Sequence, residues 1–229
     1  IIQRLEAFDL FLSENPKYKE KVTLIMVAVP SRTSVEDYKT LRNSLEQLVG
    51  RVNGEHGAFG YMPIWYLYRH MPFKKLAALY NLADVALVTP LRDGMNLIAK
   101  EFIASKTKGT GVLILSEMTG AASELGEALI VNANNKEAIV RAIKEALEMR
   151  PLEQIDRNRI MQERLQRYDI SRWSSDFMSA LFDIKRKQQG LIVRRLMEST
   201  KQKLITDYSK SLRRLLLFDY DVALVGFRR

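Results

Sequence analysis

A polar loop that contains a glycine, between an apolar run and a helical pattern, constrains this chain more than any other feature of the sequence. The apolar run at residues 84–89 predicts a buried strand, and residues 95–105 predict a helix. Open α/β sheets bind ligands at such joints, where a parallel strand ends and a helix begins. The free N–H groups and the positive dipole end of the helix suit a phosphate. The joint therefore predicts a binding site for a phosphorylated ligand.

Strands and helices are expected to alternate along the first 150 residues. Such alternation predicts βαβ units with a parallel sheet, and right-handed crossovers make the sheet a doubly wound, Rossmann-like layer. The expected strands are residues 22–29, 63–68, 84–89, 111–116 and 128–131, and the expected helices are residues 2–13, 35–48, 73–82, 95–105 and 136–149.

Two local patterns add detail to this layer. The continuous apolar run at residues 22–29 predicts a strand that is buried on both faces. The four glycines from Gly50 to Gly60 predict a turn or a long loop after the second helix.

Only helices are expected after Pro151, apart from the last few residues. Residues 153–168 and 171–189 predict two helices, and a third, basic helix is expected from about residue 192 to 209. The second of these helices carries an apolar stripe, for which core packing is the expected reason: Trp173, Phe177, Leu181 and Ile184.

The composition excludes several classes of site. The 229 residues include no Cys and two His, which excludes a disulfide framework, a zinc–thiolate site and a His-rich metal centre. No apolar stretch reaches the roughly 18 residues that a membrane span needs. Most of the net charge of +9 lies after residue 150, where the sequence has 17 Lys and Arg and 10 Asp and Glu. A solvated helix is a simpler interpretation of this basic region than a nucleic-acid site, because no aromatic residues interleave with the cations.

The loop residues carry groups that suit a nucleotide sugar. Gly94 lets the backbone approach a ligand, and Asp93 and Asn96 offer short polar groups for sugar hydroxyls. Glu101 lies further into the helix, and a carboxylate that accepts from vicinal ribose hydroxyls is a recurring nucleotide-binding device. In the alternative interpretation Asp93 only caps the helix and Glu101 is solvated. Spacing alone leaves both interpretations open.

Residues 89–97, Thr-Pro-Leu-Arg-Asp-Gly-Met-Asn-Leu, resemble the signature of the trehalose-6-phosphate synthases, which are retaining glycosyltransferases built from two Rossmann domains. The resemblance covers residues 1–150 and falls in the C-terminal, UDP-glucose-binding half of that family. It implies an α/β, doubly wound domain followed by a helical extension. Further segments resemble the family in the same order: residues 29–32, 50–54, 63–67, 111–116 and 120–122.

The activity that the resemblance implies is transfer of glucose from UDP-glucose to glucose-6-phosphate. The anomeric configuration would be retained, with no cofactor and no required metal. Asp93 would be the catalytic residue and would hold a glucose hydroxyl. The backbone of Gly94, Met95 and Asn96 would face the same glucose.

The other implied contacts are with the nucleotide and with the acceptor. The N–H groups of Leu97 and Ile98 would meet the diphosphate, and Glu101 would meet the ribose. Met71 falls where the family lines the uracil pocket. Arg32 falls where an arginine reaches the phosphate of the acceptor, which a guanidinium binds better than an ammonium does.

The chain is expected to be part of a longer protein, because Ile1 lies in the middle of a helical pattern. In the family, an N-terminal acceptor domain and an Arg and a Lys that grip the diphosphate precede this point. We therefore expect that missing domain as a partner, with UDP-glucose and glucose-6-phosphate as substrates, and no activity from this chain alone. The expected location is the cytoplasm, without nucleic-acid or membrane partners, and a homo-oligomer is allowed. Two alternatives stay open: a family member with another acceptor, and a non-catalytic module that binds a sugar phosphate.

A second resemblance lies at the C-terminal end. Residues 216–221, Leu-Leu-Phe-Asp-Tyr-Asp, resemble the first strand of haloacid-dehalogenase-type phosphatases. Trehalose-phosphate phosphatases continue with Gly-Thr, from which Val222 and Ala223 depart. The resemblance implies a bifunctional parent with three parts in this chain: a nucleotide-sugar-binding domain at residues 1–150, a helical extension at residues 151–210 and a truncated phosphatase strand at residues 211–229.

Overall fold

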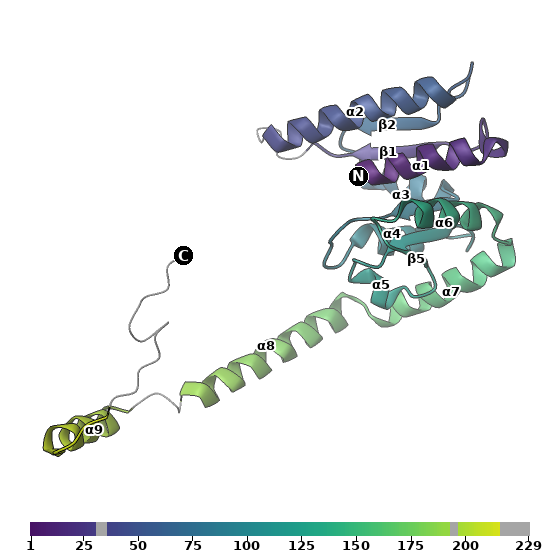
Figure 1. Cartoon of the computed structure of the whole chain (residues 1–229). Coiled ribbons are helices and arrows are strands. Elements are labelled where there is room, and N and C mark those ends of the chain that lie inside the picture. Colours follow the sequence, from purple (N-terminus) through teal and green to yellow (C-terminus); the bar gives the residue numbers. More distant parts are fainter. Residues whose placement is uncertain (31–35, 193–196, 216–229) are drawn as a thin grey trace. The chain divides into compact units, whose positions relative to one another are not determined.

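The structure is a computed structural model that describes residues 1–30, 36–192 and 197–215. It divides into two units, Ile1–Asp169 and Ile170–Arg229. In the first unit, helices flank parallel strands (Figure 1). The elements of this unit are α1 (Ile2–Glu14), η1 (Pro16–Tyr18), β1 (Leu24–Ala28), α2 (Glu36–His56), β2 (Ile64–Tyr68), α3 (Phe73–Leu82), β3 (Val85–Val88), α4 (Leu97–Ser105), β4 (Val112–Ser116), α5 (Ala121–Glu124), β5 (Leu129–Val131), α6 (Lys136–Glu148) and α7 (Pro151–Arg167).

The described strands form two parallel sheets. β1 pairs with β2, with Leu24 opposite Ile64 and Ala28 opposite Tyr68. β3, β4 and β5 form the second sheet, in that order. The predicted α/β class and the parallel pairing are confirmed, while the described strands hydrogen-bond as two sheets and not as one continuous layer.

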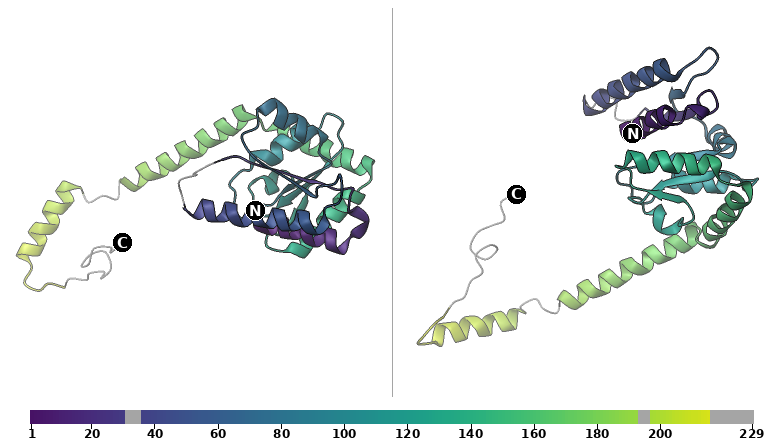
Figure 2. Two further views of the ribbon diagram at one scale, coloured as in Figure 1. Left: turned by 90° about the horizontal axis from the view of Figure 1, so that it is seen from above. Right: turned by 45° about the vertical axis from the view of Figure 1, so that its right-hand side comes forward.

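One apolar core joins the two sheets. It contains Met26 and Ile64 from the first sheet and Val112 and Ile114 from the second, each at most 6% exposed. Helix α1 lies beside both α2 and α6 (Figure 1 and Figure 2) and faces this core. Full burial of one large apolar side chain stabilises a fold by about 1.5–3 kcal/mol. The largest apolar side chains that α1 buries are Leu5, Phe8, Phe11 and Leu12.

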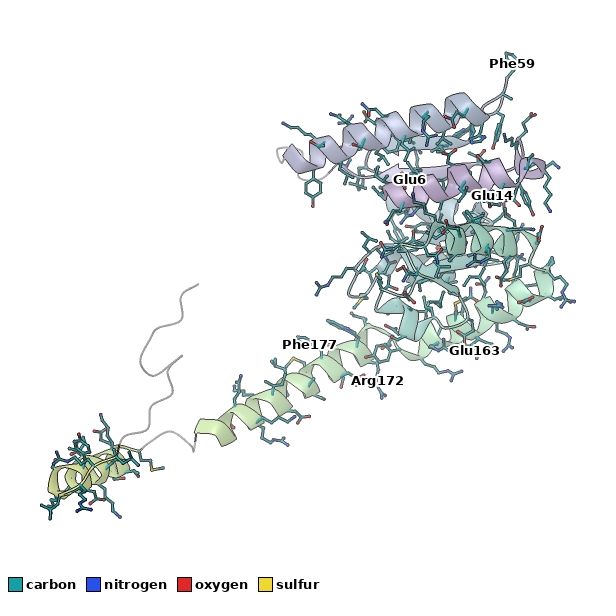
Figure 3. All side chains as sticks on the ribbon, viewed as in Figure 1. Glu6, Glu14, Phe59, Glu163, Arg172 and Phe177 are labelled. Atoms are coloured by element: carbon teal, nitrogen blue, oxygen red, sulfur yellow. The ribbon has the colours of Figure 1, made fainter. Side chains whose placement is uncertain are left out.

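Charged side chains tie α1 to both of its neighbouring helices. Asp9 Oδ2 accepts from Arg51 of α2 at 2.9 Å, and Asp9 Oδ1 lies 2.8 Å from Nε2 of His56 on the same helix. Glu6, labelled on α1 in Figure 3, pairs with Lys136 of α6 at 2.7 Å. These contacts hold the helix between the two parts of the core.

Helix α2 extends further than the sequence predicts. The glycines from Gly50 to Gly60 predict a loop, but the helix continues through Gly50 to His56. That prediction is wrong because the buried face continues past the glycine with Val52, which is fully buried. Such burial outweighs the cost of about 1 kcal/mol for a glycine in a helix. The turn comes later, and Phe59 is fully exposed at its tip (Figure 3).

The first sheet is covered on one face only. Met26 of β1 faces the core, whereas Ile25 is 41% exposed and its partner across the ladder, Trp65, is 53% exposed. The prediction of a strand buried on both faces is therefore wrong for β1 within the described residues. The cause is that α1 and α2 pack against the Met26 face alone.

Helix α7 is part of the first unit, although it falls in the helical extension expected from the sequence. It contacts α4. Asn158 Nδ2 donates to the backbone oxygen of Gly111 at 2.8 Å, and Arg164 pairs with Glu127 at 2.6 Å. The division between the two units accordingly comes after Asp169.

The second unit contains α8 (Ile170–Ile192) and α9 (Glu198–Lys210). Phe177 and Arg172 project from opposite sides of α8 (Figure 3). None of the described helices combines the length and the apolar character that a membrane span requires. The expected phosphatase strand, residues 216–221, lies outside the described residues. The stripe for which core packing is expected is exposed here: Trp173 by 40%, Phe177 by 56%, Leu181 by 47% and Ile184 by 54%.

Replacement of Asp9 by alanine is expected to lower the free energy of unfolding by about 1–3 kcal/mol, because it removes the acceptor of Arg51 and of the buried His56. Glu163→Ala is the matched control, since Glu163 is 44% exposed and pairs with arginines of its own helix. The control should change stability by less than about 0.5 kcal/mol. Urea unfolding followed by circular dichroism measures both variants. Equally small effects would show that Asp9 does not hold α1 against α2.

Candidate ligand-binding site

Asp93 organises the loop between β3 and α4. Its Oδ1 accepts hydrogen bonds from the backbone N–H groups of Met95 at 3.1 Å and of Asn96 at 3.0 Å. Its Oδ2 accepts from Nδ2 of Asn96 at 3.0 Å. A carboxylate offers about four acceptor positions. The loop therefore uses most of this carboxylate and leaves about one position for a ligand.

Asn96 is the N-cap of α4. Its Oδ1 accepts from the N–H of Ala99 at 3.0 Å, and its φ of 62° lies in the left-handed region, which asparagine tolerates better than most residues. The interpretation in which Asp93 caps the helix is therefore wrong. The helix geometry leaves the N–H groups of Leu97 and Ile98 without an acceptor inside the helix, so they are available to an anion.

The loop after β4 braces the Asp93 loop. The N–H of Asp93 donates to the oxygen of Met118 at 3.2 Å, and the N–H of Gly120 donates to the oxygen of Asp93 at 3.0 Å. A Cβ at Gly120 would lie 2.0 Å from the oxygen of Gly94, so only glycine allows the two loops to meet this closely. Gly94 itself faces open space, which leaves its backbone accessible to a ligand.

Glu101 is half-buried on α4, beside Tyr80 of α3. Burial, together with the charge and the hydrogen bond of Glu101, raises the pKa of Tyr80 to about 12. The Tyr80 hydroxyl therefore stays protonated at neutral pH beside the Glu101 carboxylate. Glu101 is half-buried and not fully solvated.

The two remaining predicted residues do not belong to this loop. Met71 is half-buried and follows β2, a strand of the other sheet. Arg32 lies outside the described residues. Of the predicted site residues, the structure thus brings residues 93–98 together at one loop and helix start, with Glu101 further along the same helix.

Sequence reasoning misses one charged side chain beside this loop. Arg4 of α1 donates from Nε to Oγ1 of Thr89 at 3.2 Å, and Thr89 leads from β3 into the Asp93 loop. Burial lowers the pKa of Arg4 below its ordinary value. Sequence patterns do not indicate this contact, because the two residues lie 85 positions apart in the chain.

A second polar cluster lies between α1 and α2. One ligand atom each from Asp9, Glu55 and His56 lies within 4.8 Å of the others, a spacing that a metal ion could use. Arg51 already pairs with Asp9 at 2.9 Å and with Glu55 at 3.1 Å, so the protein itself balances the carboxylate charges. The cluster therefore has a structural role in joining the two helices.

Two surface hollows lie along α6 and not at the Asp93 loop. Arg141 and Glu145 line both of them, and no predicted site residue lines either. The hydrogen-bonding groups, and not the hollows, therefore locate the candidate site.

Comparison with known sequences gives a family match. The sequence model of glycosyltransferase family 20 matches residues 1–183. The bifunctional trehalose-6-phosphate synthase/phosphatase of Thermoproteus tenax is 48% identical over 227 residues, which cover 98% of this chain and 31% of that protein. The chain thus spans about a third of the length of this curated relative.

Solved structures share the fold. One of them is an E. coli structure with bound UDP-2-fluoro glucose, which is 39% identical in sequence to this chain. The two superpose with a TM-score of 0.76, over 78% of this chain and 40% of the E. coli chain. An alpha,alpha-trehalose-phosphate synthase (UDP-forming) from Burkholderia xenovorans, in complex with glucose-6-phosphate, is 38% identical, with a TM-score of 0.77 over 79% of this chain and 40% of its own.

Gly120→Ala is expected to destabilise the chain by about 1–3 kcal/mol, because its Cβ cannot fit against the oxygen of Gly94 without moving one of the two loops. Gly126→Ala is the matched control, since a Cβ at Gly126 meets open space. Thermal unfolding of both variants measures the difference. If the two variants unfold alike, the loops are not in the close contact described.

Raising the pH from 10 toward 12 is expected to lower stability through Tyr80. Its pKa in the folded chain is raised from 10.0 to about 12. The corresponding stabilisation is complete below pH 10 and is lost as the pH rises through about 12. Tyr80→Phe cannot ionise, so its free energy of unfolding should fall less steeply over this window. Tyr208→Phe, in the second unit, serves as the control and should fall as the unaltered chain does. An equally steep fall for Tyr80→Phe would contradict the assignment.

Proposed function

The chain belongs to glycosyltransferase family 20, and on that premise we propose that it is the UDP-glucose-binding half of a retaining glucosyltransferase. The parent protein transfers glucose to glucose-6-phosphate and forms trehalose-6-phosphate. The observation that carries this proposal is the loop of residues 93–98, in which a family signature coincides with a braced turn and an open helix start. The similarity to structures solved with UDP-2-fluoro glucose and with glucose-6-phosphate supports the choice of substrates.

The diphosphate binds at the start of α4. The N–H groups of Leu97 and Ile98 point along the helix axis at its positive end, which favours an anion. These groups also stabilise the negative charge that develops on UDP as the glycosidic bond breaks. The side chains of both residues are at least half exposed, so a ligand can reach this helix end.

The glucose lies against the loop itself. The one acceptor position that remains on the Asp93 carboxylate takes a glucose hydroxyl, and the backbone of Gly94, Met95 and Asn96 lines the same sugar. Because Asp93 also fixes the N–H groups of Met95 and Asn96, one residue shapes the loop and binds the substrate. This double role is the reason to name it as the catalytic residue.

The nucleoside and the acceptor take the remaining residues. Glu101, which is half-buried beside Tyr80, accepts from the ribose hydroxyls. Met71 lines the uracil pocket, and Arg32, which lies outside the described residues, binds the phosphate of glucose-6-phosphate.

The mechanism is one of position and charge. The acceptor hydroxyl is held against the anomeric carbon on the face that UDP leaves, so the configuration is retained. Stabilisation of the leaving diphosphate supplies most of the catalysis, and no side chain of the loop serves as a dedicated acid or base.

An N-terminal acceptor domain of the same parent is the partner that completes the site, and the parent works in the cytoplasm. A homo-oligomer is compatible with this assignment. Alone, the chain binds UDP-glucose at most weakly and does not turn it over.

Isothermal titration of the chain with UDP and with UDP-glucose tests the proposal. Asp93→Asn retains Oδ1 as the acceptor for the N–H groups of Met95 and Asn96, but it removes the charge and the acceptor of Asn96 Nδ2. It should weaken the binding of UDP-glucose by about tenfold or more and the binding of UDP by clearly less, because the sugar loses a charge-assisted hydrogen bond that UDP does not make. Asp156→Ala, on the exposed face of α7, is the control and should change neither affinity.

Two results would contradict the proposal. An equal loss of UDP and UDP-glucose affinity in Asp93→Asn would remove the sugar contact from Asp93. Rapid formation of trehalose-6-phosphate by the unaltered chain alone would show that no further domain is needed.

A further inference from the structure

Arg4 is a cation beside the candidate site that has no assigned role. Its Nε donates to Oγ1 of Thr89, which is 6% exposed at the end of β3. Among the described residues, no carboxylate pairs with Arg4, whereas Arg51, Arg157 and Arg164 each have such a partner. The guanidinium group therefore stands next to the Asp93 loop with its charge unbalanced.

The energetics of this position are unfavourable in the free chain. Burial lowers the pKa of Arg4, which means that its surroundings disfavour the charge. A desolvated cation without a counter-ion costs free energy that an arriving anion would recover.

Arg4 has hydrogen-bond donors to offer an anion. The residue is half-buried, so its surroundings desolvate it without enclosing it completely. Its two Nη groups make no hydrogen bond with the described residues beyond the single Nε contact to Thr89. A guanidinium presents such a pair of N–H donors in a planar fork that matches two oxygens of a phosphate.

We propose that Arg4 forms an anion site with the end of β3, and that this site takes the diphosphate of the nucleotide sugar. The inference rests on the proposed function for the identity of the ligand, but the anion site itself does not. Arg4 would then supply positive charge to the diphosphate from α1, in addition to the N–H groups of Leu97 and Ile98. The competing explanation is that Arg4 only ties α1 to β3 through Thr89.

The test compares thermal unfolding of the chain with and without inorganic pyrophosphate, in phosphate-free buffer. Addition of pyrophosphate to the unaltered chain should raise its unfolding midpoint temperature. Arg4→Met should weaken the binding of pyrophosphate by roughly tenfold or more. Arg4→Lys retains a point charge and should keep an intermediate affinity. Arg141→Met, which removes an exposed cation on α6, is the matched control and should respond as the unaltered chain does.

The unfolding temperature of Arg4→Met without pyrophosphate separates a structural tie from an anion site. A structural tie predicts that Arg4→Met unfolds at a lower temperature in every buffer and keeps the same pyrophosphate response. An anion site predicts that the variant is at least as stable as the unaltered chain without pyrophosphate and that only its response is lost.

Three results would overturn the inference: no response of the unaltered chain to pyrophosphate, an unchanged response in Arg4→Met, or a response lost in Arg141→Met. A repeat with UDP-glucose distinguishes the two proposals. If pyrophosphate binds through Arg4 and UDP-glucose does not bind, the anion site stands and the proposed function fails. If UDP-glucose binds equally well to Arg4→Met, the proposed function stands and the anion inference fails.

Discussion

The hydrogen bonds of the Asp93 carboxylate hold in place the part of the structure on which the function depends. They turn the backbone at Met95 and Asn96, and this turn lets Asn96 adopt its left-handed conformation and cap α4. The cap in turn defines which N–H groups of the helix remain open. Because Gly120 braces the loop from the next strand, the protein's own hydrogen bonds hold the loop in shape. Such preorganisation reduces the cost of binding and of charge development.

Helix α1 is central to the core that stabilises the same unit. Helix α1 buries Phe8 and Phe11 against both sheets, while Asp9 reaches α2 and Glu6 reaches α6. The helix also brings Arg4 to the end of β3. Packing and site chemistry therefore meet on one element, so a change that loosens α1 should disturb the Asp93 loop through Thr89.

Much of this arrangement could be predicted from the sequence, because most of it follows from local patterns. Apolar runs predict every described strand, and the signature predicts the loop, since both depend on residues that are adjacent in the chain. Sequence patterns predict less where a contact between residues far apart in the chain determines the local structure. The helix continues past Gly50 because Val52 contacts the core, and Ile25 is exposed because no helix in the described part of the chain covers its face. The contact between Arg4 and Thr89 could not be predicted, because the two residues lie far apart in the sequence.

An amide NMR titration of the chain with UDP-glucose tests the central claim most directly. The account predicts that the largest shifts occur at the N–H groups of Leu97 and Ile98, followed by Gly94 and Met95, and that UDP alone shifts mainly the first two. Largest shifts along α6, where the surface hollows lie, with no change at residues 93–98, would contradict it.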